Sequence, residues 1–254
     1  MAPLLPIHYV EHFHLLFLAQ LGRKLDKNHF VLKGGCNLRF FYGSPRYSED
    51  MDIDAQNVAA MLLRDRVNAI LTENPLRQIL LAGGIEIEHV TEHKQTATTQ
   101  RWKLGLRIAS TTPVLATKIE FSRRSTGGAA IFESMPPALI RLHAIPPLMI
   151  NHYTREAAFG QKLEALIARS APQARDVFDL HLLLSGGTKT AGLNPRHTGW
   201  LAEAKSRILA MEFKIFKSQV IAYLSDEDQA PYDSEDVWDR MRLEVIAALE
   251  KMSP

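Results

Sequence analysis

One stretch of the chain, FVLKGGCNLRFFYGSPRYSEDMDID at residues 30–54, constrains the fold more than any other. Its apolar start predicts a short strand over Phe30 to Leu32, and Gly34-Gly35 predicts the break that ends this strand. Apolar residues after the glycines then predict an amphipathic turn of helix. A polar loop follows, and a second strand is expected to carry Asp50, Asp52 and Asp54.

The acidic strand and the glycine pair point to the same chemistry. Side chains alternate between the two faces of a strand, so Asp50, Asp52 and Asp54 share one face and repel each other. A divalent cation is the usual compensation for such a cluster. Gly34-Gly35 allows backbone N–H groups at a helix start to approach a phosphate closely. A phosphate-binding turn followed by a metal-binding strand suits nucleoside triphosphate chemistry.

A further carboxylate lies in a later strand of the chain, which is predicted over residues 113–123. Glu120 occupies the middle of this strand, where a carboxylate is costly unless it is satisfied. Two-metal phosphoryl transfer needs a third carboxylate, which helps to hold the metal and can accept the proton of the attacking hydroxyl. Glu120 is our candidate for it. The alternative is an ion pair of Glu120 with one of three nearby basic residues, Lys118, Arg123 or Arg124.

The second part of the chain predicts helices. Prolines punctuate residues 136–152, which predict strands or short extended pieces leaving a first domain. Thr154 is a good N-cap for a helix that runs to about Arg169, and the next helix holds Asp176 and Asp179. We therefore expect an α/β domain over residues 1–150 and a helical domain over residues 151–254. Its aromatic residues are expected to be packing residues, not base-stacking platforms: Trp200, Phe213, Phe216, Tyr223 and Trp238.

Two blocks of sequence resemble a known family. Lys33-Gly34-Gly35 followed by Arg46-Tyr47-Ser48-Glu49-Asp50-Met51-Asp52-Ile53-Asp54 resembles the signature of the DNA polymerase β-like nucleotidyltransferases, and more narrowly their AbiEii/AbiGii toxin branch. The second block runs from Gln161-Lys162-Leu163-Glu164 through Arg169 to Arg175-Asp176-Val177-Phe178-Asp179 and is similar to later helical motifs of that branch. Cys36 departs from the pattern, since a hydroxyl residue is common after the glycine pair. The resemblance implies an α/β (α+β) fold: a polymerase-β-like core with a mixed sheet, then a helical domain that completes the nucleotide cleft.

The resemblance also implies roles for individual residues. Asp50 and Asp52 would bind two Mg²⁺ ions, ~4 Å apart in such sites, together with Glu120. Asp54 would support these ligands without binding the metal itself. Lys162 would face the leaving pyrophosphate as a point charge, with Asp176 completing a polar network and Asp179 bracing the helices. The alternative for this group is a salt bridge between two helices. The residues expected to contact the nucleotide are Lys33, Gly34, Gly35, Ser48, Lys162 and Asp176.

The activity implied is transfer of a nucleoside monophosphate from a nucleoside triphosphate to an acceptor hydroxyl, an EC 2.7.7 type of reaction. The resemblance suggests the toxin of a toxin–antitoxin or phage-defence pair, with tRNA or another cellular molecule as acceptor and a cognate antitoxin as partner. Two alternatives stay open. One is an adenylyltransferase acting on a protein or a small molecule, and the other is a nucleotide-binding module without transfer activity.

Composition limits where an RNA acceptor can bind. The formal net charge is only +2, so a nucleic-acid surface must be a local patch. Arg123-Arg124 opens a loop, residues 123–128, that is either such a patch or a solvated turn. Lys205, Arg207, Lys214 and Lys217 form either a basic strip or ordinary helix surface. The chain shows no signal peptide and no apolar run long enough to span a membrane, and its lone Cys36 fits a reducing compartment, so a cytoplasmic protein is expected.

Overall fold

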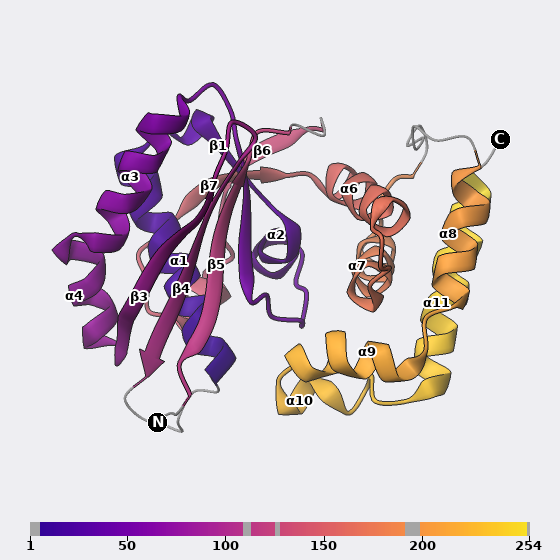
Figure 1. Cartoon of the computed structure of the whole chain (residues 1–254). Helices are drawn as coiled ribbons and strands as arrows, with labels where there is room; N and C mark the ends of the chain where they lie inside the picture. Colours follow the sequence, from indigo (N-terminus) through magenta and orange to yellow (C-terminus); the bar gives the residue numbers. More distant parts are fainter. Residues whose placement is uncertain (1–5, 109–112, 125–127, 191–198, 253–254) are drawn as a thin grey trace. The chain divides into compact units, whose positions relative to one another are not determined.

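The structure is a computed structural model, and it describes residues 6–108, 113–124, 128–190 and 199–252. The chain divides into two compact units (Figure 1). The α/β unit holds most of the chain before Thr154, and the helical unit holds the chain from Thr154 onward. The short loop Tyr42–Arg46 groups with the helical unit, although it lies between two elements of the α/β unit.

The α/β unit is built on a mixed sheet. Within the described residues this sheet has seven strands in the order β3-β4-β5-β2-β1-β7-β6. The two central strands, β1 and β2, are antiparallel, while β2 pairs with β5 and β1 pairs with β7 in parallel. The observed mixed sheet confirms the predicted fold class. The strands are β1 (Phe30–Lys33), β2 (Asp50–Ala55), β3 (Ile85–Gln95), β4 (Thr99–Ile108), β5 (Leu115–Ser122), β6 (Ala130–Ser134) and β7 (Met149–Tyr153).

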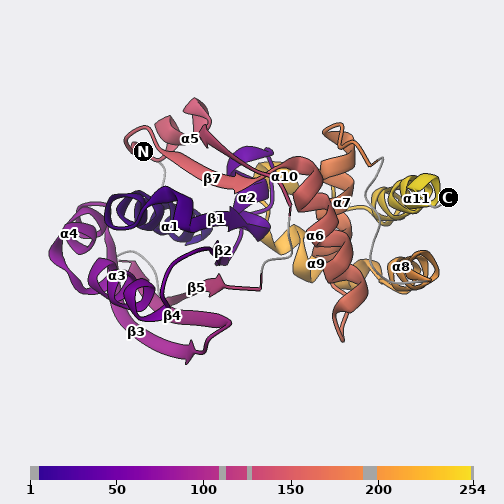
Figure 2. The same cartoon turned by 90° about the horizontal axis from the view of Figure 1, so that it is seen from above.

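Helices cover the apolar face of this sheet. The helical elements of the unit are α1 (Pro6–Lys24), η1 (Lys27–His29), α2 (Gly34–Phe41), α3 (Ala60–Thr72), α4 (Asn74–Ala82) and α5 (Pro137–Leu142). Helices α1, α3 and α4 pack against one another (Figure 2) and share one core with the sheet. Met51 and Ile53 of β2 and Ile119 and Phe121 of β5 are fully buried in this core. The residues that alternate with them, among them Asp52 and Glu120, therefore lie on the opposite face.

Helix α5 differs from the expectation of extended chain over residues 136–152. Pro136 is the N-cap and Pro137 is the first helical residue. Proline is well tolerated at the first position of a helix, because its fixed φ suits the helix and its missing N–H would have no partner there. The prolines therefore start a helix here instead of marking extended chain.

The helical unit has a core of its own. Its elements are α6 (Arg155–Ala168), α7 (Ala174–Ser185), α8 (Trp200–Leu209), α9 (Phe213–Gln219), η2 (Ile221–Tyr223), α10 (Asp226–Gln229) and α11 (Glu235–Met252). Thr154 caps α6 by accepting a hydrogen bond from the N–H of Ala157, as predicted. The ring of Phe216 stacks on that of Trp238 at 4.4 Å between centroids. Trp200, Phe216 and Trp238 are buried, which confirms their predicted role in packing. No helix in the described parts of the chain is both long and apolar enough to span a membrane.

Candidate active site

A row of four charged side chains crosses the sheet on the face opposite the core. The strand register pairs Lys33 of β1 with Asp52 of β2, Asp52 with Glu120 of β5, and Glu120 with Arg101 of β4. Paired residues on neighbouring strands lie about 5 Å apart and point to the same face. We call Lys33, Asp52, Glu120 and Arg101 the charged row. The fold thus brings together Asp52 and Glu120, two of the predicted metal ligands that are distant in the sequence.

Asp52 is the least compensated member of the charged row. Its side chain is half-buried, and no described residue donates a hydrogen bond to it or forms an ion pair with it. Burial raises the pKa of Asp52 above its ordinary value; Lys33 and Lys118 oppose this rise, while Glu120 and Asp50 add to it. When Asp52 is ionised, its negative charge has no described ion-pair partner.

Gly34 packs directly against Asp52. Its φ of +67° lies in the left-handed region that favours glycine. A Cβ atom added at Gly34 would lie 2.9 Å from Oδ2 of Asp52. Helix α2 begins at Gly34, so the unpaired N–H groups of its first turn and the carboxylate of Asp52 are close together. The predicted phosphate-binding turn and the predicted metal-binding strand therefore meet at this point.

Asp50 and Glu120 each have a basic partner. Nζ of Lys118 lies 2.6 Å from Oδ2 of Asp50, and Nε of Arg101 donates to Oε2 of Glu120 at 2.6 Å. The predicted alternative for Glu120 was an ion pair with Lys118, Arg123 or Arg124, but the observed partner is Arg101. Sequence reasoning missed Arg101 because it lies on β4, and the pairing of β4 with β5 leaves no local signal in the sequence.

Lys33 of the charged row forms an ion pair with the buried Asp54. Nζ of Lys33 donates to Oδ1 of Asp54, and the hydroxyl of Tyr153 donates to Oδ2 at 2.7 Å. Burial and the nearby Asp54 raise the pKa of Tyr153, so this hydroxyl stays protonated and donates a hydrogen bond to Asp54. Both oxygens of Asp54 are thus engaged. The predicted nucleotide-binding residue Lys33 is held by Asp54, and the hydroxyl of Ser48 donates to the carbonyl of Asp50 at 2.8 Å.

The carboxylates fit a divalent cation chemically, although they are not assembled around one. Among the described residues, no group of three His, Cys, Asp or Glu side chains has the geometry of a metal site. The half-buried Asp52 nevertheless has no described partner, and burial, with a smaller contribution from Glu120 and Asp50, raises its pKa. A cation bound there would supply the missing charge. We conclude that Asp50, Asp52 and Glu120 fit a hard cation such as Mg²⁺.

The helical unit contains a second, buried cluster. Asp176 and Asp179 on α7 are both fully buried. Nζ of Lys162 on α6 lies 2.6 Å from Oδ2 of Asp179 and 3.4 Å from Oδ1 of Asp176. Nε of Arg169 lies 3.2 Å from Oδ2 of Asp176 without the alignment of a hydrogen bond, so this contact is coulombic. These contacts are ion pairs between α6 and α7, the alternative considered for this group in the sequence, and Asp179 is the nearer partner of Lys162.

Arg46 completes this cluster from a distant part of the sequence. Its Nη2 atom lies 3.3 and 3.2 Å from the two oxygens of Asp179, across 133 positions of the chain. Burial pushes the pKa of Asp179 upward, but the charges of Arg46 and Lys162 hold it below its ordinary value. Sequence reasoning placed Arg46 in the first motif without a role. The structure groups it with the helical unit, whereas the aspartates of the same motif belong to the α/β unit.

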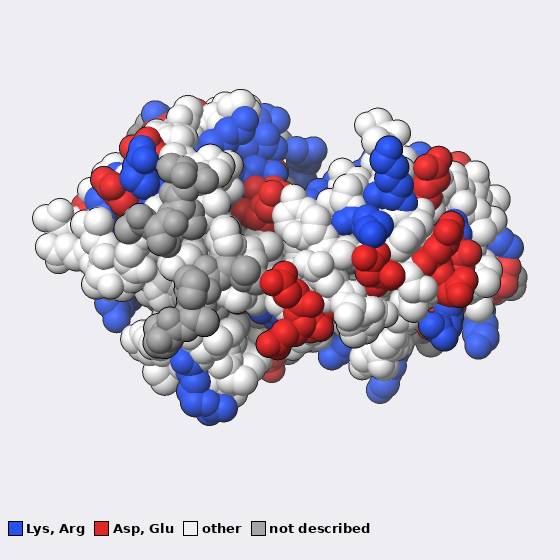
Figure 3. Space-filling view, turned by 90° about the horizontal axis from the view of Figure 1, so that it is seen from below, with Lys and Arg blue, Asp and Glu red and all other residues white. Residues whose placement is uncertain are grey.

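The predicted basic strip consists mostly of paired side chains. Lys205 is paired with Glu250, Arg207 with Glu203, and Lys217 with Asp233. On the face shown in Figure 3, basic and acidic side chains are interspersed, so neither sign covers it. These pairs favour ordinary helix surface over a polynucleotide track. The other candidate patch, residues 123–128, lies partly outside the described residues; Arg123 and Arg124 are described.

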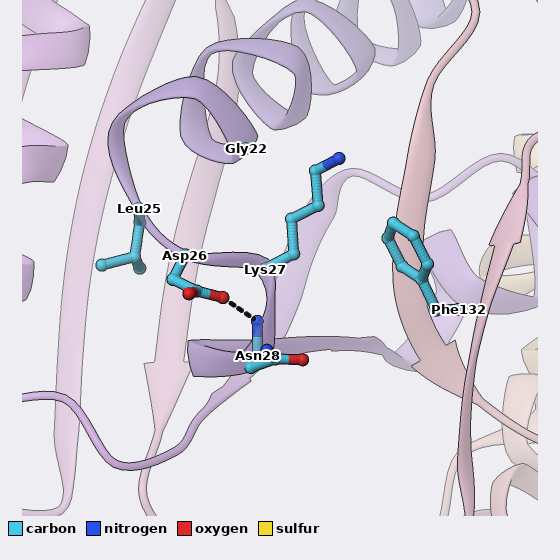
Figure 4. Close-up of a pocket in the computed structure, with 6 residues that line it drawn as sticks. All are labelled: Gly22, Leu25, Asp26, Lys27, Asn28 and Phe132. Atoms are coloured by element: carbon cyan, nitrogen blue, oxygen red, sulfur yellow. Dashed lines mark hydrogen bonds between the residues drawn. The ribbon is translucent and has the colours of Figure 1, made fainter.

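A cavity of about 430 Å³ lies away from the charged row. It is lined by Gly22, Leu25, Asp26, Lys27, Asn28 and Phe132 (Figure 4). The carboxylate of Asp26 accepts a hydrogen bond from the N–H of Asn28, and the ammonium of Lys27 lies 5.1 Å from the ring centre of Phe132. None of the predicted site residues lines this cavity, so we assign it no part in the candidate active site.

Comparisons with known proteins support the fold. The mixed sheet carrying a glycine turn and an acidic strand defines a nucleotidyltransferase-type fold. A candidate nucleotidyltransferase of Helicobacter pylori has a similar structure, with a TM-score of 0.58, 19% identity and coverage of 96% of both chains. JHP933 from Helicobacter pylori gives a TM-score of 0.55 at 19% identity, covering 97% of this chain and 94% of the other. The comparison with curated proteins found no match.

The family is shown by the sequence as a whole. The family model of the AbiEii nucleotidyl transferase toxins, of type IV toxin–antitoxin systems, matches residues 16–251. The chain belongs to this family. It is therefore a nucleotidyltransferase of the toxin class, as the two motifs predicted.

Proposed function

We propose that the protein transfers a nucleoside monophosphate from a nucleoside triphosphate to a hydroxyl group of an RNA acceptor, with tRNA as the first candidate, and that the reaction depends on Mg²⁺. In a toxin–antitoxin pair, a cognate antitoxin would limit this activity. The charged row carries the proposal, because Asp52 combines three properties. It has no described partner, it lies beside the glycine turn, and Glu120 is its direct neighbour.

In the α/β unit, one group of residues would bind the phosphates and another would bind the metal. The first turn of α2, which begins at Gly34, would donate backbone N–H groups to the phosphates, with Lys33 and Ser48 alongside. Asp50, Asp52 and Glu120 would hold Mg²⁺. When bound, two Mg²⁺ ions would offset the negative charge of the three carboxylates and lower the pKa of the acceptor hydroxyl. Glu120 would then take the proton of that hydroxyl at Oε2, the atom that now accepts from Arg101.

Lys162 would contact the triphosphate from the helical unit. Its ammonium group has three N–H donors, and two acidic residues, Asp176 and Asp179, lie close to it. One donor therefore remains for a phosphate oxygen. Asp176 and Asp179 would fix the ammonium in place, so that its charge stabilises the leaving pyrophosphate.

A labelling experiment tests the proposal. The purified protein is incubated with Mg²⁺ and each α-³²P-labelled nucleoside triphosphate, with total tRNA, total protein or neither. We expect label on tRNA from one preferred nucleotide. Asp52→Asn should lower this labelling by roughly 10²-fold or more, because it removes a metal-binding charge without changing the size of the side chain. Glu86→Gln, which removes a carboxylate from the exposed side of β3, is the matched control and should label tRNA normally.

Other outcomes of this experiment would replace the proposal. Label on protein would make the chain a protein-modifying adenylyltransferase or a related enzyme. Nucleotide binding without transfer to any fraction would favour a binding module. The ion pairs of Asp50 with Lys118 and of Glu120 with Arg101 are the observations that favour this last reading.

A further inference from the structure

Strands β3 and β4 extend the sheet face that carries the charged row out to one edge of the sheet (Figure 1). Arg101 of β4 belongs to that row. Because side chains alternate along a strand, Lys103, Gly105 and Arg107 share its face. Lys103 and Arg107 are exposed, while the residues of β4 that alternate with them are buried in the core. The charged row therefore borders an exposed surface.

Cations lie opposite one another across these strands. The register pairs Lys118 of β5 with Lys103 of β4, and it pairs Arg101 of β4 with Lys94 of β3. Residues paired in this way lie about 5 Å apart, and like charges placed directly opposite each other destabilise a sheet. Lys94 and Lys103 are exposed, so the core does not require a basic residue at either position. A bound anion would relieve the repulsion between these cations.

Lys94 and Lys103 are also the uncompensated cations of this face. Among the described residues, the other cations on it have carboxylate partners: Lys118 with Asp50, Arg101 with Glu120, and Arg107 with Glu88. No described carboxylate forms an ion pair with Lys94 or Lys103. The acidic residues of β3, Glu86 and Glu88, lie at the other end of the face, beside Arg107. The two lysines are therefore available to an anionic ligand.

An exposed aromatic ring lies on the same face. His89 of β3 is paired with Gly105 of β4. A Cβ atom added at Gly105 would lie 2.2 Å from Cε1 of His89, 2.6 Å from Nδ1 and 2.9 Å from Nε2, so the ring packs over the glycine. Gly105 is buried, whereas His89 remains exposed. Proteins hold single-stranded RNA with this combination, in which cations contact phosphates and rings stack on bases.

We propose that the β3–β4 surface, made of Lys94, Lys103 and His89, binds a single-stranded stretch of the RNA acceptor. The two lysines contact its phosphates, and the ring of His89 stacks on a base. Lys94 lies directly beyond Arg101 in the register of the charged row, about 10 Å from Glu120. This assignment rests on the proposed transfer function, whose acceptor it places. RNA is favoured over an acidic protein segment because bases use the exposed ring as well as the cations.

RNA binding at several salt concentrations tests the two lysines. Fluorescence anisotropy of a fluorescein-labelled single-stranded RNA of twelve nucleotides is measured at pH 8, without nucleotide or Mg²⁺. Lys94→Gln and Lys103→Gln should each weaken binding by roughly 3-fold or more and should each reduce the slope of log affinity against log salt by about 0.7, the value for one phosphate contact. Lys214→Gln, which removes an exposed lysine from α9, is the matched control and should bind RNA as the wild type does.

Replacement of His89 tests the stacking position separately. His89→Ala should weaken binding of the same RNA and leave the salt slope unchanged, because stacking on a base releases no counterions. An abasic strand with the same sugar–phosphate backbone should bind His89→Ala and the wild type equally. Urea denaturation should show Lys94→Gln and Lys103→Gln to be at least as stable as the wild type, since each substitution removes a repulsive charge. Weaker RNA binding would then not be a result of unfolding.

Three results would overturn the proposal. The first is an unchanged affinity and salt slope in both lysine variants, and the second is an equal loss of binding in Lys214→Gln. The third is binding of poly-L-glutamate that depends on the two lysines while RNA binding does not, which would assign the surface to an acidic protein segment.

The labelling experiment separates this surface from the proposed function. Label on tRNA, together with normal RNA binding by both lysine variants, would reject the surface alone. RNA binding that depends on Lys94 and Lys103, without transfer of label to any fraction, would reject the transfer reaction and leave the surface in place.

Discussion

Two aspartates of β2 have the same chemistry and opposite surroundings. Asp54 is buried and has both oxygens occupied by Lys33 and Tyr153. Asp52, on the same face of the strand, has no described partner, and burial raises its pKa. A carboxylate that is satisfied within the protein stabilises the fold, while one that is not is available to a ligand. The difference therefore separates a structural residue from a candidate metal ligand.

Replacing Asp52 by asparagine should increase the stability of the fold and abolish transfer activity. The folded pKa of Asp52 is raised, so ionisation of this group destabilises the fold as the pH rises through that pKa. At pH 7 without metal, we expect Asp52→Asn to be more stable than the wild type, on the order of 1 kcal/mol by urea denaturation. Its transfer activity should be lost. Asp54→Asn should instead be destabilised, because it removes the ion-pair partner of the partly buried Lys33. Equal effects of the two substitutions would contradict our assignment.

His14 links α1 to β5 and, through Thr117, to Glu49, the residue that precedes β2. The hydroxyl of Thr117 donates to the carbonyl of Glu49 at 2.6 Å, so Nε2 of His14, 2.8 Å from that hydroxyl, is the donor to it. Sγ of Cys36 lies 3.7 Å from Nδ1 on the other side of the ring. Burial lowers the pKa of His14 from 6.5 to about 4, against the opposing influence of Asp50 and Glu11. The ring is therefore neutral at physiological pH.

This neutral histidine should make the fold sensitive to acid. The unfolded chain binds a proton at His14 from about pH 6.5 downward, while the folded protein does so only near pH 4. Stability should therefore fall as the pH drops through this window, by roughly 3 kcal/mol for a fully buried ring. Urea denaturation at pH 7 and pH 5 should show a smaller loss for His14→Gln than for the wild type. His93→Gln, at an exposed position, is the control; an unchanged pH dependence in His14→Gln would reject the assignment.

At the scale of elements, the junction of β1 and α2 depends on one glycine. Gly34 combines a left-handed φ with close contact to Asp52. Gly43 has the same φ of +67°, but a Cβ added there would meet nothing within 4 Å. A substitution at either glycine therefore introduces the same backbone strain, but only one at Gly34 also introduces a steric contact with Asp52.

The pair of alanine variants uses this difference. Both Gly34→Ala and Gly43→Ala should lose about 1–2 kcal/mol of stability, because a Cβ is unfavourable at this φ. Only Gly34→Ala should also displace Asp52 and lower transfer activity, by an expected 10-fold or more in the labelling assay. Equal activity of the two variants at a temperature where both are folded would show that the contact with Asp52 does not matter for catalysis.

At the scale of the whole molecule, distant segments are held together by buried charge. Arg46, in the loop between α2 and β2, pairs with Asp179 of α7, and Lys162 binds the same carboxylate. Asp179 is fully buried, and Arg46 is only 4% exposed. Removing one partner of such a pair leaves the other charge without compensation in a medium of low polarity.

A double-mutant cycle should measure this link. We expect Asp179→Asn to destabilise the protein by about 3 kcal/mol, and the coupling energy between Asp179→Asn and Arg46→Met to be about 1–3 kcal/mol. The pair of His181 and Glu244, also on the helical unit but more exposed, is the matched control and should show coupling below about 1 kcal/mol. A coupling between Arg46 and Asp179 as small as that of the control would mean that the loop is held by other contacts.

Much of this protein can be read from its sequence, because its signals are local. A short apolar run predicted the strand that became β1, and alternation of apolar residues predicted β5. The expected acidic strand became β2, and the cap at Thr154 predicted the start of α6. The spacing of Asp50, Asp52 and Asp54 was enough to place them on one face, since the geometry of a strand depends only on its own backbone. Helix α5 was missed because prolines end some elements and begin others, and the choice depends on the packing around them.

The tertiary structure decided which charges are compensated. Asp50 is paired with Lys118, Glu120 with Arg101, and Asp179 with Arg46, and each partner comes from a different segment of the chain. Such pairs depend on strand register and on the closure of long loops, which no sequence window contains. The sequence therefore determined which side chains can do chemistry. Tertiary packing left Asp52 without a described partner, and for that physical reason the candidate metal site centres on this residue.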